Sequence, residues 1–397
     1  MPKENPGQIS SLQVTIGGQT VDPALVAGIM IKQCLSQKFG PIGRISVIDA
    51  ERNLAKIKGD GSETAEVTWT DHNGQRFNFE FMVDTGQNID SHSDGSDTNN
   101  SARKHNTYIF TLNGKDTKNV NGGVVYGAKN KPAGDHLDEI YKKLDSKPLK
   151  KNVNPYPTSI NIDKKGFNDA IQEILNKCKV PGENSSYCMI FEDKEGTKIL
   201  DAYENMFKGA SVASYKDDPT NTKQDSEVII RVSSSNIFTN PGAIRTAANT
   251  VTSQFNPANG GLRLNVPSNG GFQTLGRNPG KNGANNTNNT FHNYPDALNN
   301  RYNQRNYSEE ANRYKLENLH LKDNSAEFVV FPQPKVDIGK VVDFSIPAKD
   351  DKNTTTGNPK INGKMLVRTI IHRIGAVGEE PRYTQVLQTL KGDPEGR

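Results

Sequence analysis

Histidine is the side chain in this sequence best suited to bind a metal or to exchange a proton near neutral pH. The seven histidines are His72, His92, His105, His136, His292, His320 and His372. No two of them, and no histidine with a cysteine, stand at the spacing of zinc ligands, so we predict no zinc site. His372 lies in a strongly apolar stretch, and we interpret it as a packed side chain rather than a reactive one.

The acidic loop around His92 is the nearest approach to a calcium site. Asp90, Asp94 and Asp97 surround this histidine. Their spacing does not match an EF-hand loop, and the bidentate glutamate that such a loop needs is missing. We therefore expect a solvated loop here.

The cysteines indicate neither a disulfide framework nor a nucleophile. There are three, Cys34, Cys178 and Cys188, and an odd number at irregular spacing does not build such a framework. Cys178 falls on the apolar face of a predicted helix, where we expect a core position.

Paired carboxylates, which glycoside hydrolases require, are not evident. Glu63 and Glu66 lie beside a predicted strand, and Asp350 and Asp351 belong to a charged loop. The chain has no Gly-x-Ser-x-Gly motif and no glycine-rich phosphate loop after a strand. The sequence therefore predicts no catalytic, cofactor-binding or metal-binding residue, and it does not identify interface residues. We expect that the protein is not an enzyme.

The bulk composition bounds the class of protein. The chain has 397 residues, enough for two or three domains, and its hydrophobic content of 33% indicates abundant loops. The net charge of +4 is mild and spread along the chain, which argues against a protein that reads nucleic-acid sequence. No secretory segment follows Met1, and no apolar run approaches the ~18 residues of a membrane span. We expect a soluble protein made in a cytoplasm and not inserted in a membrane.

Residues 8–145 are predicted to be mostly β and to form a first antiparallel barrel. Strand patterns at 66–70 and 76–83 flank Asp71-His72-Asn73-Gly74, a strong hairpin turn because Asn-Gly tolerates positive φ. A Ser/Asp/Asn-rich loop then leads to a further strand at 107–112.

Residues 155–215 are predicted to form a small α/β module. An amphipathic helix follows Asp163, a plausible N-cap, and ends before Pro181-Gly182. A hairpin with strands at 187–191 and 197–200 comes next, followed by a loop at 203–207. A further short helix is expected just before this module, between Asp135 and Leu149.

Residues 222–235 and 308–393 are predicted to form a second barrel, divided by an insertion at 236–307. The insertion is rich in Asn, Gly and Thr and poor in aliphatic residues, so it cannot build a core, and we expect a long surface loop of extended chain. A helix begins at Ser308, a plausible N-cap, and four short strands follow from about residue 327.

The chain also contains a faint internal repeat. Residues 77–116 and 365–393 share one plan, in which a strand, a loop and a second strand end in a turn that contains Asp116 or Asp393. Two copies of one barrel would explain it. The predicted fold class is therefore mainly β with an α+β insert: two similar antiparallel β-barrel domains linked by a small helix-hairpin module.

This order of elements resembles the hub proteins of contractile tails, which include myophage baseplate hubs, phage late-control protein D and the hub part of type VI secretion spikes. The best local markers are the turn from Pro334 to Lys340, the segment Asn362-Gly363-Lys364, His372 and the late strand at Tyr383. The sequence departs from the family where Ile338-Gly339 replaces the usual Pro-Gly, and in the Asn-rich insertion.

The resemblance implies a structural function rather than a catalytic one. Hubs of this family are homotrimers in which six barrels form a ring that adapts a six-fold tail tube to a three-fold spike. The implied partners are the spike, the tail tube and other baseplate proteins, and genomic DNA passes through the channel without sequence-specific binding. The implied location is the tail baseplate of a virion assembled in the host cytoplasm. Two alternatives stay open from the residues: a surface adhesin or receptor-binding protein, and a tail-associated cell-wall hydrolase.

Overall fold

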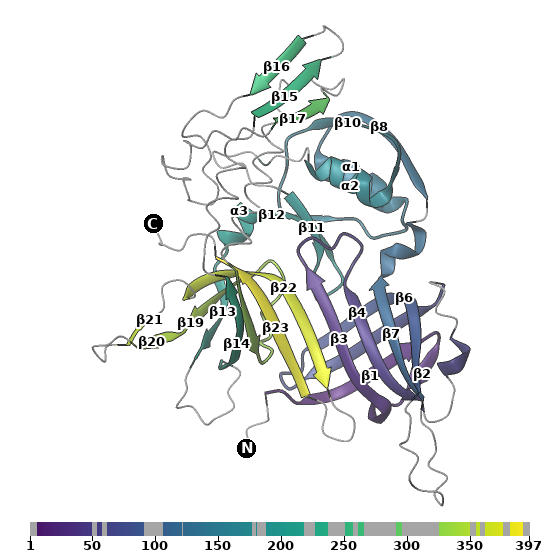
Figure 1. Ribbon diagram of the computed structural model, residues 1–397, viewed down its shortest axis with the longest axis vertical. Helices are drawn as coiled ribbons and strands as arrows, with labels where there is room; N and C mark the ends of the chain where they lie inside the picture. The colour runs from purple at the N-terminus through teal and green to yellow at the C-terminus, as the bar shows by residue number, and fades with distance from the viewer. Residues whose placement is uncertain are drawn as a thin grey trace, which may run out of the picture.

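The computed structural model describes most of the chain apart from the Asn-rich segment and several loops. The described residues are 6–49, 54–57, 62–90, 106–120, 122–176, 180, 188–217, 227–236, 251–256, 261–265, 291–295, 325–349, 355–357, 362–375 and 382–391. Strands dominate these residues and helices are few, which confirms the predicted class of a mainly β protein with a small α/β insert (Figure 1). None of the helices in the described residues has the length and hydrophobicity to span a membrane.

The first part of the chain is β-rich. Its elements are β1 Ile9–Ile16, β2 Gln19–Val21, the 3-10 turn η1 Pro23–Leu25, β3 Val26–Cys34, β4 Ile42–Asp49, η2 Leu54–Lys56, β5 Thr64–Asp71, β6 Arg76–Asp90, β7 Asn106–Gly114 and η3 Lys115–Asn119.

Helices are confined to the middle of the described chain. This part contains β8 Gly123–Lys131, α1 Ala133–Lys142, β9 Lys150–Lys151, β10 Thr158–Gly166, α2 Phe167–Asn176, β11 Cys188–Glu192, β12 Lys198–Ala202, α3 Tyr203–Phe207 and β13 Ser211–Lys216.

The last part of the described chain is again β. It contains β14 Ile229–Asn236, β15 Val251–Asn256, β16 Gly261–Asn265, β17 Phe291–Pro295, β18 Ser325–Val330, β19 Val341–Ser345, β20 Pro347–Lys349, β21 Thr355–Gly357, β22 Gly363–Gly375 and β23 Arg382–Leu390.

The hairpin of β5 and β6 shows how local sequence builds the sheet. Phe77, Phe79 and Phe81 alternate with polar residues, and each is buried in the first core cluster. Asp71 Oδ1 accepts hydrogen bonds from the backbone N–H of Asn73 and of Gln75, both at 2.9 Å, and Gly74 has φ 75°. The turn predicted from the sequence is therefore present, and it sets the register of both strands.

The strands do not divide into two separate closed barrels. One sheet of 13 strands follows the path β14-β18-β23-β22-β3-β4-β7-β6-β5-β1-β2, with β13 and β19 paired beside it. The joint is β22, whose first residues pair with β19 and whose last seven residues, Thr369–Gly375, pair with Cys34 to Gly28 of β3. Single bridges from Gln8 to Arg382 and from Lys216 to Val228 bring distant strands of this path back into contact.

The C-terminal hairpin of β22 and β23 therefore serves both halves of the sheet. Ile374 and Tyr383 belong to the core cluster of the first half, while Val367 and Leu387 belong to the cluster of the second half. The faint repeat maps onto two antiparallel hairpins, β6 with β7 and β22 with β23.

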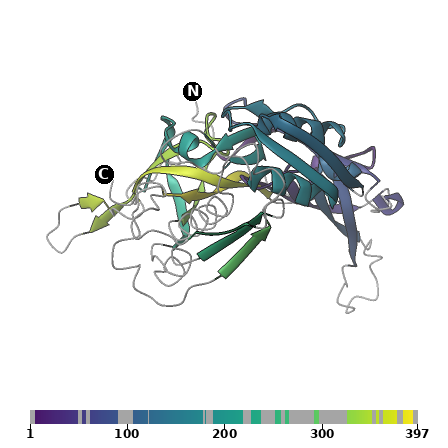
Figure 2. The same ribbon diagram turned by 90° about the horizontal axis from the view of Figure 1, so that it is seen from above.

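The helices α1 and α2 lie together with the two-stranded sheet β8-β10 and the three-stranded sheet β11-β12-β9, next to the main sheet (Figures 1 and 2). Their cluster contains buried side chains of both α1 and α2, such as Ile140 and Ile171. The predicted N-cap Asp163 is wrong, because this residue lies within β10 and the helix begins at Phe167. The expected loop at 203–207 is instead the short helix α3.

The Asn-rich insertion contains β strands as well as connecting chain. β15, β16 and β17 pair only with one another in the strand pairing of the described residues, as a three-stranded sheet apart from the main one. Where the sequence predicted only extended loop, this part is a small sheet. The helix predicted from Ser308 lies outside the described residues.

Candidate functional site

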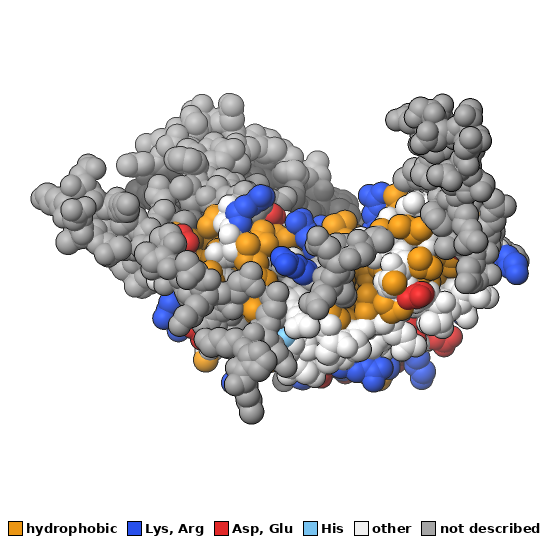
Figure 3. Space-filling view, turned by 90° about the horizontal axis from the view of Figure 1, so that it is seen from below, with side chains coloured by type: hydrophobic (Ala, Val, Ile, Leu, Met, Phe, Trp, Pro, Cys, Tyr) orange, Lys and Arg blue, Asp and Glu red, His pale blue; other side chains and the backbone are white. Residues whose placement is uncertain are grey.

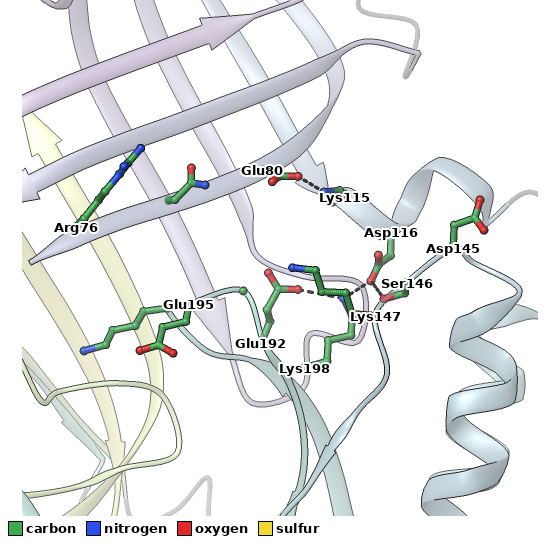
Figure 4. A pocket seen from close by; sticks show the side chains of 13 residues that line it. Arg76, Glu80, Lys115, Asp116, Asp145, Ser146, Lys147, Glu192, Glu195 and Lys198 are labelled. Atoms are coloured by element: carbon green, nitrogen blue, oxygen red, sulfur yellow. Dashed lines mark hydrogen bonds and ion pairs between the residues drawn. The ribbon is translucent and has the colours of Figure 1, made fainter.

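A charged pocket of about 350 Å³ lies where the outer face of β6 meets the helix-hairpin module (Figure 4). It is lined by Arg76, Asn78, Glu80, Lys115, Asp116, Asp145, Ser146, Lys147, Glu192, Lys194, Glu195, Gly196 and Lys198. These residues come from β6, η3, the turn after α1 and the β11-β12 hairpin. The volume falls in the range of small-molecule sites, but the lining is charged rather than apolar.

Three of the lining side chains form a buried ion cluster. Lys198 Nζ contacts Asp116 Oδ2 and lies 3.1 Å from Glu192 Oε2, and Ser146 Oγ donates to Asp116 Oδ2 at 3.2 Å. The Lys198 and Asp116 side chains are only 7% and 8% exposed. We call Lys198, Asp116 and Glu192 the ion cluster.

The surroundings of the ion cluster shift the pKa values of Lys198 and Glu192. Burial by itself lowers the pKa of Lys198, but the carboxylates of Glu192 and Asp116 outweigh it and hold that pKa above its ordinary value. Burial raises the pKa of Glu192, and the Lys198 ammonium opposes this rise. The Lys198 ammonium is therefore stabilised in its charged form by the two carboxylates beside it.

The hairpin turn between β11 and β12 explains the position of two of these charges. Asp193 Oδ1 accepts hydrogen bonds from the backbone N–H of Glu195 at 3.0 Å and of Thr197 at 2.9 Å, and Gly196 has φ 73°. This turn places Glu192 and Lys198 directly opposite each other in the strand register. Asp116 approaches them from η3, at the end of the first group of strands.

The pocket rim carries further charges that are already paired. Lys115 contacts Glu80, and both side chains are about half exposed. Lys194 donates its Nζ to the Pro334 carbonyl, and its backbone N–H lies 3.2 Å from Asp337 Oδ2. Burial raises the pKa of Asp337 to about 6. The Lys194 contacts tie the β11-β12 hairpin to the C-terminal half of the chain, while the Lys115–Glu80 pair lies within the first part.

The acids of the pocket interior are already engaged in ion pairs. Its buried acids are paired with a lysine, and its lining includes no histidine or cysteine. Within the described part of the chain, no group of three His, Cys, Asp or Glu side chains is placed to hold a metal ion. The arrangement suits a structural ion cluster that fixes one layer of the molecule against another.

A second polar group is buried at the seam between β3 and the C-terminal hairpin. His372 Nε2 lies 2.8 Å from Gln33 Oε1, so that nitrogen carries the proton, and His372 Nδ1 accepts from the Tyr383 hydroxyl at 2.6 Å. Gln385 donates to the Tyr383 hydroxyl at 2.8 Å, and Gln33 donates to the Glu192 carbonyl at 3.1 Å.

This hydrogen-bonded group around His372 lies among packed aromatic rings. The His372 ring lies 5.4 to 5.7 Å from the rings of Trp69, Phe77 and Phe79. Burial lowers the pKa of His372 to about 3, so the imidazole is neutral at physiological pH. The His372 side chain is fully buried, as expected from the sequence for a packed residue.

The other residues considered in the sequence are scattered. His136 is buried, with Nε2 at 2.9 Å from the Thr158 carbonyl and Nδ1 at 2.7 Å from the Tyr126 hydroxyl. Cys34 is half-buried and Cys188 is buried, and neither forms a disulfide bond among the described residues. Glu66 lies on β5 directly opposite Glu80 of the neighbouring strand β6, and Glu63 directly precedes β5.

Several of those residues cannot be placed. Cys178, His92, His105, His320, Asp94, Asp97, Asp350 and Asp351 lie outside the described residues, and the side chains of Asp90 and His292 are not described.

The ion cluster and Gln33 were not identified from the sequence. Asp116 is 82 positions from Lys198, and a lysine at the start of a strand carries no local signal of burial. The available signal was the short separation of Glu192 and Lys198 across a predicted turn, which places them opposite each other but does not show that they are buried.

Comparisons with known proteins give a shared fold. No family model and no curated protein sequence matches the chain. The tail protein of Neisseria meningitidis MC58 matches with a TM-score of 0.58 and 12% identity, over 96% of this chain and 97% of that chain. The 43 kDa tail protein of prophage MuSo2 from Shewanella oneidensis matches with a TM-score of 0.58 and 11% identity, over 96% of this chain and 98% of that chain. The resemblance to tail proteins inferred from the sequence is thus confirmed for the fold.

Proposed function

We propose that this chain is the structural baseplate hub of a contractile phage tail. The observation that carries the proposal is the fold that the chain shares, over 96% of its length, with two phage tail proteins. In this role, three copies form a ring between the six-fold tail tube and the three-fold spike, within the virion baseplate. The genome passes through the ring without sequence-specific binding.

The edges of the main sheet support a ring. Beyond Val83, the described part of β6 pairs with β7 on one side, while β5 ends its pairing at Met82, so residues 84–90 present a free edge. β14 is the strand at one end of the sheet path, and it pairs with β18 on one side. The residues just before β14 contact β13 through the Lys216–Val228 bridge and the hydrogen bond from the Lys216 N–H to the Glu227 carbonyl, and in the described residues no strand pairs with the rest of that side of β14. Two free edges on one chain allow head-to-tail pairing between copies, and such contacts generate rings when the rotation closes.

A role without catalysis also fits the charged pocket. Its buried charges are paired and hold the layers of the molecule together. A cell-wall hydrolase would need a pair of free carboxylates or a metal cluster facing a cleft. An adhesin has no need to assemble with a spike protein, so the sample that contains the candidate spike separates it from a hub.

The test is the mass of the purified protein by light scattering at micromolar concentration, alone and with its candidate spike protein. We expect three times the 43.6 kDa chain mass for the protein alone, or that mass plus the mass of the spike when the two are mixed. A monomer in both samples would overturn the proposal.

A pair of variants tests the sheet edge within the same experiment. Ile230 is exposed on β14, and Ile230→Lys places a charge on the free edge, which blocks strand addition. Val125→Lys makes the same change at an exposed position on β8, outside the main sheet. We expect Ile230→Lys to give monomers and Val125→Lys to leave the trimer intact.

A further inference from the structure

The outer face of β22, β3 and β4 carries an ordered set of basic and apolar side chains. Arg373 is opposite Met30, and Met30 is opposite Arg44, so these three form one row across the strands. The adjacent row consists of Ile371, Lys32 and Ile42. We call these six residues the basic sheet face.

The basic sheet face has a uniform sign of charge. Arg44 and Arg373 are exposed and Lys32 is half-buried. The three strands contain one carboxylate, Asp49, which is buried on the opposite side and accepts the Leu54 backbone N–H at 3.1 Å. The positive charge is therefore not neutralised by an acid on the same strands.

The same face also exposes apolar surface. Met30 is 42% exposed and Ile42 is 41% exposed, and the two lie on neighbouring strands. Figure 3 shows hydrophobic and basic side chains lying side by side near the middle of the described surface. Exposed methionine and isoleucine between arginines are typical of a protein interface, where Met and Arg are enriched.

We propose that the basic sheet face binds an acidic amphipathic helical segment of another protein. A carboxylate of the segment would pair with each arginine, and an apolar side chain between them would cover Met30. Arginine is suited to this contact because its planar fork can pair with a carboxylate through two hydrogen bonds.

The distance between Arg373 and Arg44 determines where the acidic residues of the bound helix should lie. Arg373 and Arg44 are two strands apart, or about 10 Å at the usual distance between neighbouring strands. Residues i and i+7 of a helix share a face and are about 10.5 Å apart along its axis. Acids at i and i+7 with apolar residues at i+3 and i+4 therefore match both arginines and Met30.

A nucleic acid fits this face less well. Phosphates would pair with the three cations but would leave Met30 and Ile42 without apolar contacts. The six residues include no aromatic ring on which an unpaired base could stack. The inference concerns the face of a single chain, so it stands or fails separately from the proposed trimer.

The test uses a fluorescent synthetic helical peptide of about 21 residues with Glu at i and i+7 and Leu at i+3 and i+4. Its binding to the full chain is measured by fluorescence anisotropy beside that of a scrambled peptide. We expect the designed peptide to bind and the scrambled one to bind at least several-fold more weakly. Arg44→Glu combined with Arg373→Glu should weaken binding about thirtyfold, since each of the two lost pairs contributes on the order of 1 kcal/mol.

Two variants serve as controls for charge and for apolar contact. Lys150→Glu makes the same kind of charge change at an exposed residue of β9 and should leave binding within about twofold. Met30→Ser should weaken binding several-fold, whereas Val125→Ser, at an exposed apolar residue of β8, should not.

Three outcomes would overturn the proposal. The first is equal binding of designed and scrambled peptides, and the second is absence of binding at millimolar peptide. The third is tighter binding of about 20 base pairs of duplex DNA, lost in the double arginine variant but unchanged by Met30→Ser, which would make the face a polyanion surface. Circular dichroism melts of each variant show that the fold is retained, and Arg373→Gln replaces the charge reversal if it is not.

Discussion

At the scale of the residue, Lys198 balances two buried acids. Lys198→Met should destabilise the protein by about 3 kcal/mol, because Asp116 and Glu192 would remain in the interior without a cation. Lys115→Met removes a pair whose side chains are 63% and 48% exposed, so its cost should stay below about 1 kcal/mol. Urea unfolding of both variants measures the difference, and equal costs would show that the ion cluster does not stabilise the fold.

His372 should make the protein sensitive to acid. Its pKa is about 3 in the folded chain and 6.5 in the unfolded chain, because burial disfavours the imidazolium. Above pH 6.5 both states are neutral, and between pH 6.5 and 3 only the unfolded state takes up the proton, so stability falls as pH falls. Unfolding free energies from pH 7 to 4 should fall more steeply for the wild type than for His372→Gln. Parallel curves for the two proteins would contradict the buried neutral imidazole.

At the scale of the element, alternation along the strands decides what a substitution costs. Phe79 and Val367, predicted from the sequence to point inward, are 2% and 0% exposed, in the cores of the two halves of the sheet. Phe79→Asp or Val367→Asp should prevent folding of that half, since a lone carboxylate there has neither water nor a partner. Asn78→Asp, one residue away on the exposed face of β6, should melt within a few degrees of the wild type. Thermal melts of the three variants measure these effects. A similar fall in melting temperature for all three would mean that the sheet register is wrong.

At the scale of the whole molecule, the Asn-rich insertion should be separable from the main fold. Deleting residues 256–300 removes β16 and β17, whose strand pairing in the described residues stays within their own small sheet. The melting temperature should therefore change little. If the deletion unfolds the protein as Phe79→Asp does, the insertion belongs to the core. We expect instead that the shortened chain melts normally and no longer assembles with neighbouring tail proteins, measured by co-purification.

The sequence alone determined the features that depend on nearby residues. Alternating side chains with an Asn-Gly turn specified the β5-β6 hairpin, because a two-residue period and a positive φ are local properties. The α1 helix, the β11-β12 hairpin and the mainly β class were predicted for the same reason. The order of these elements was sufficient to suggest the tail-protein fold.

Only the tertiary structure decided how distant segments meet. Pairing of β22 with β3 joins residues more than 300 positions apart and makes the two halves, each with its own core, one continuous sheet. The ion cluster and the contact between His372 and Gln33 likewise bring together side chains that the sequence separates by 82 and 339 positions. Periodicity reports which face of a strand is buried, but it does not report which strand lies beside it. The partner is chosen by packing and by the pairing of buried polar groups, which exist only once the chain has folded.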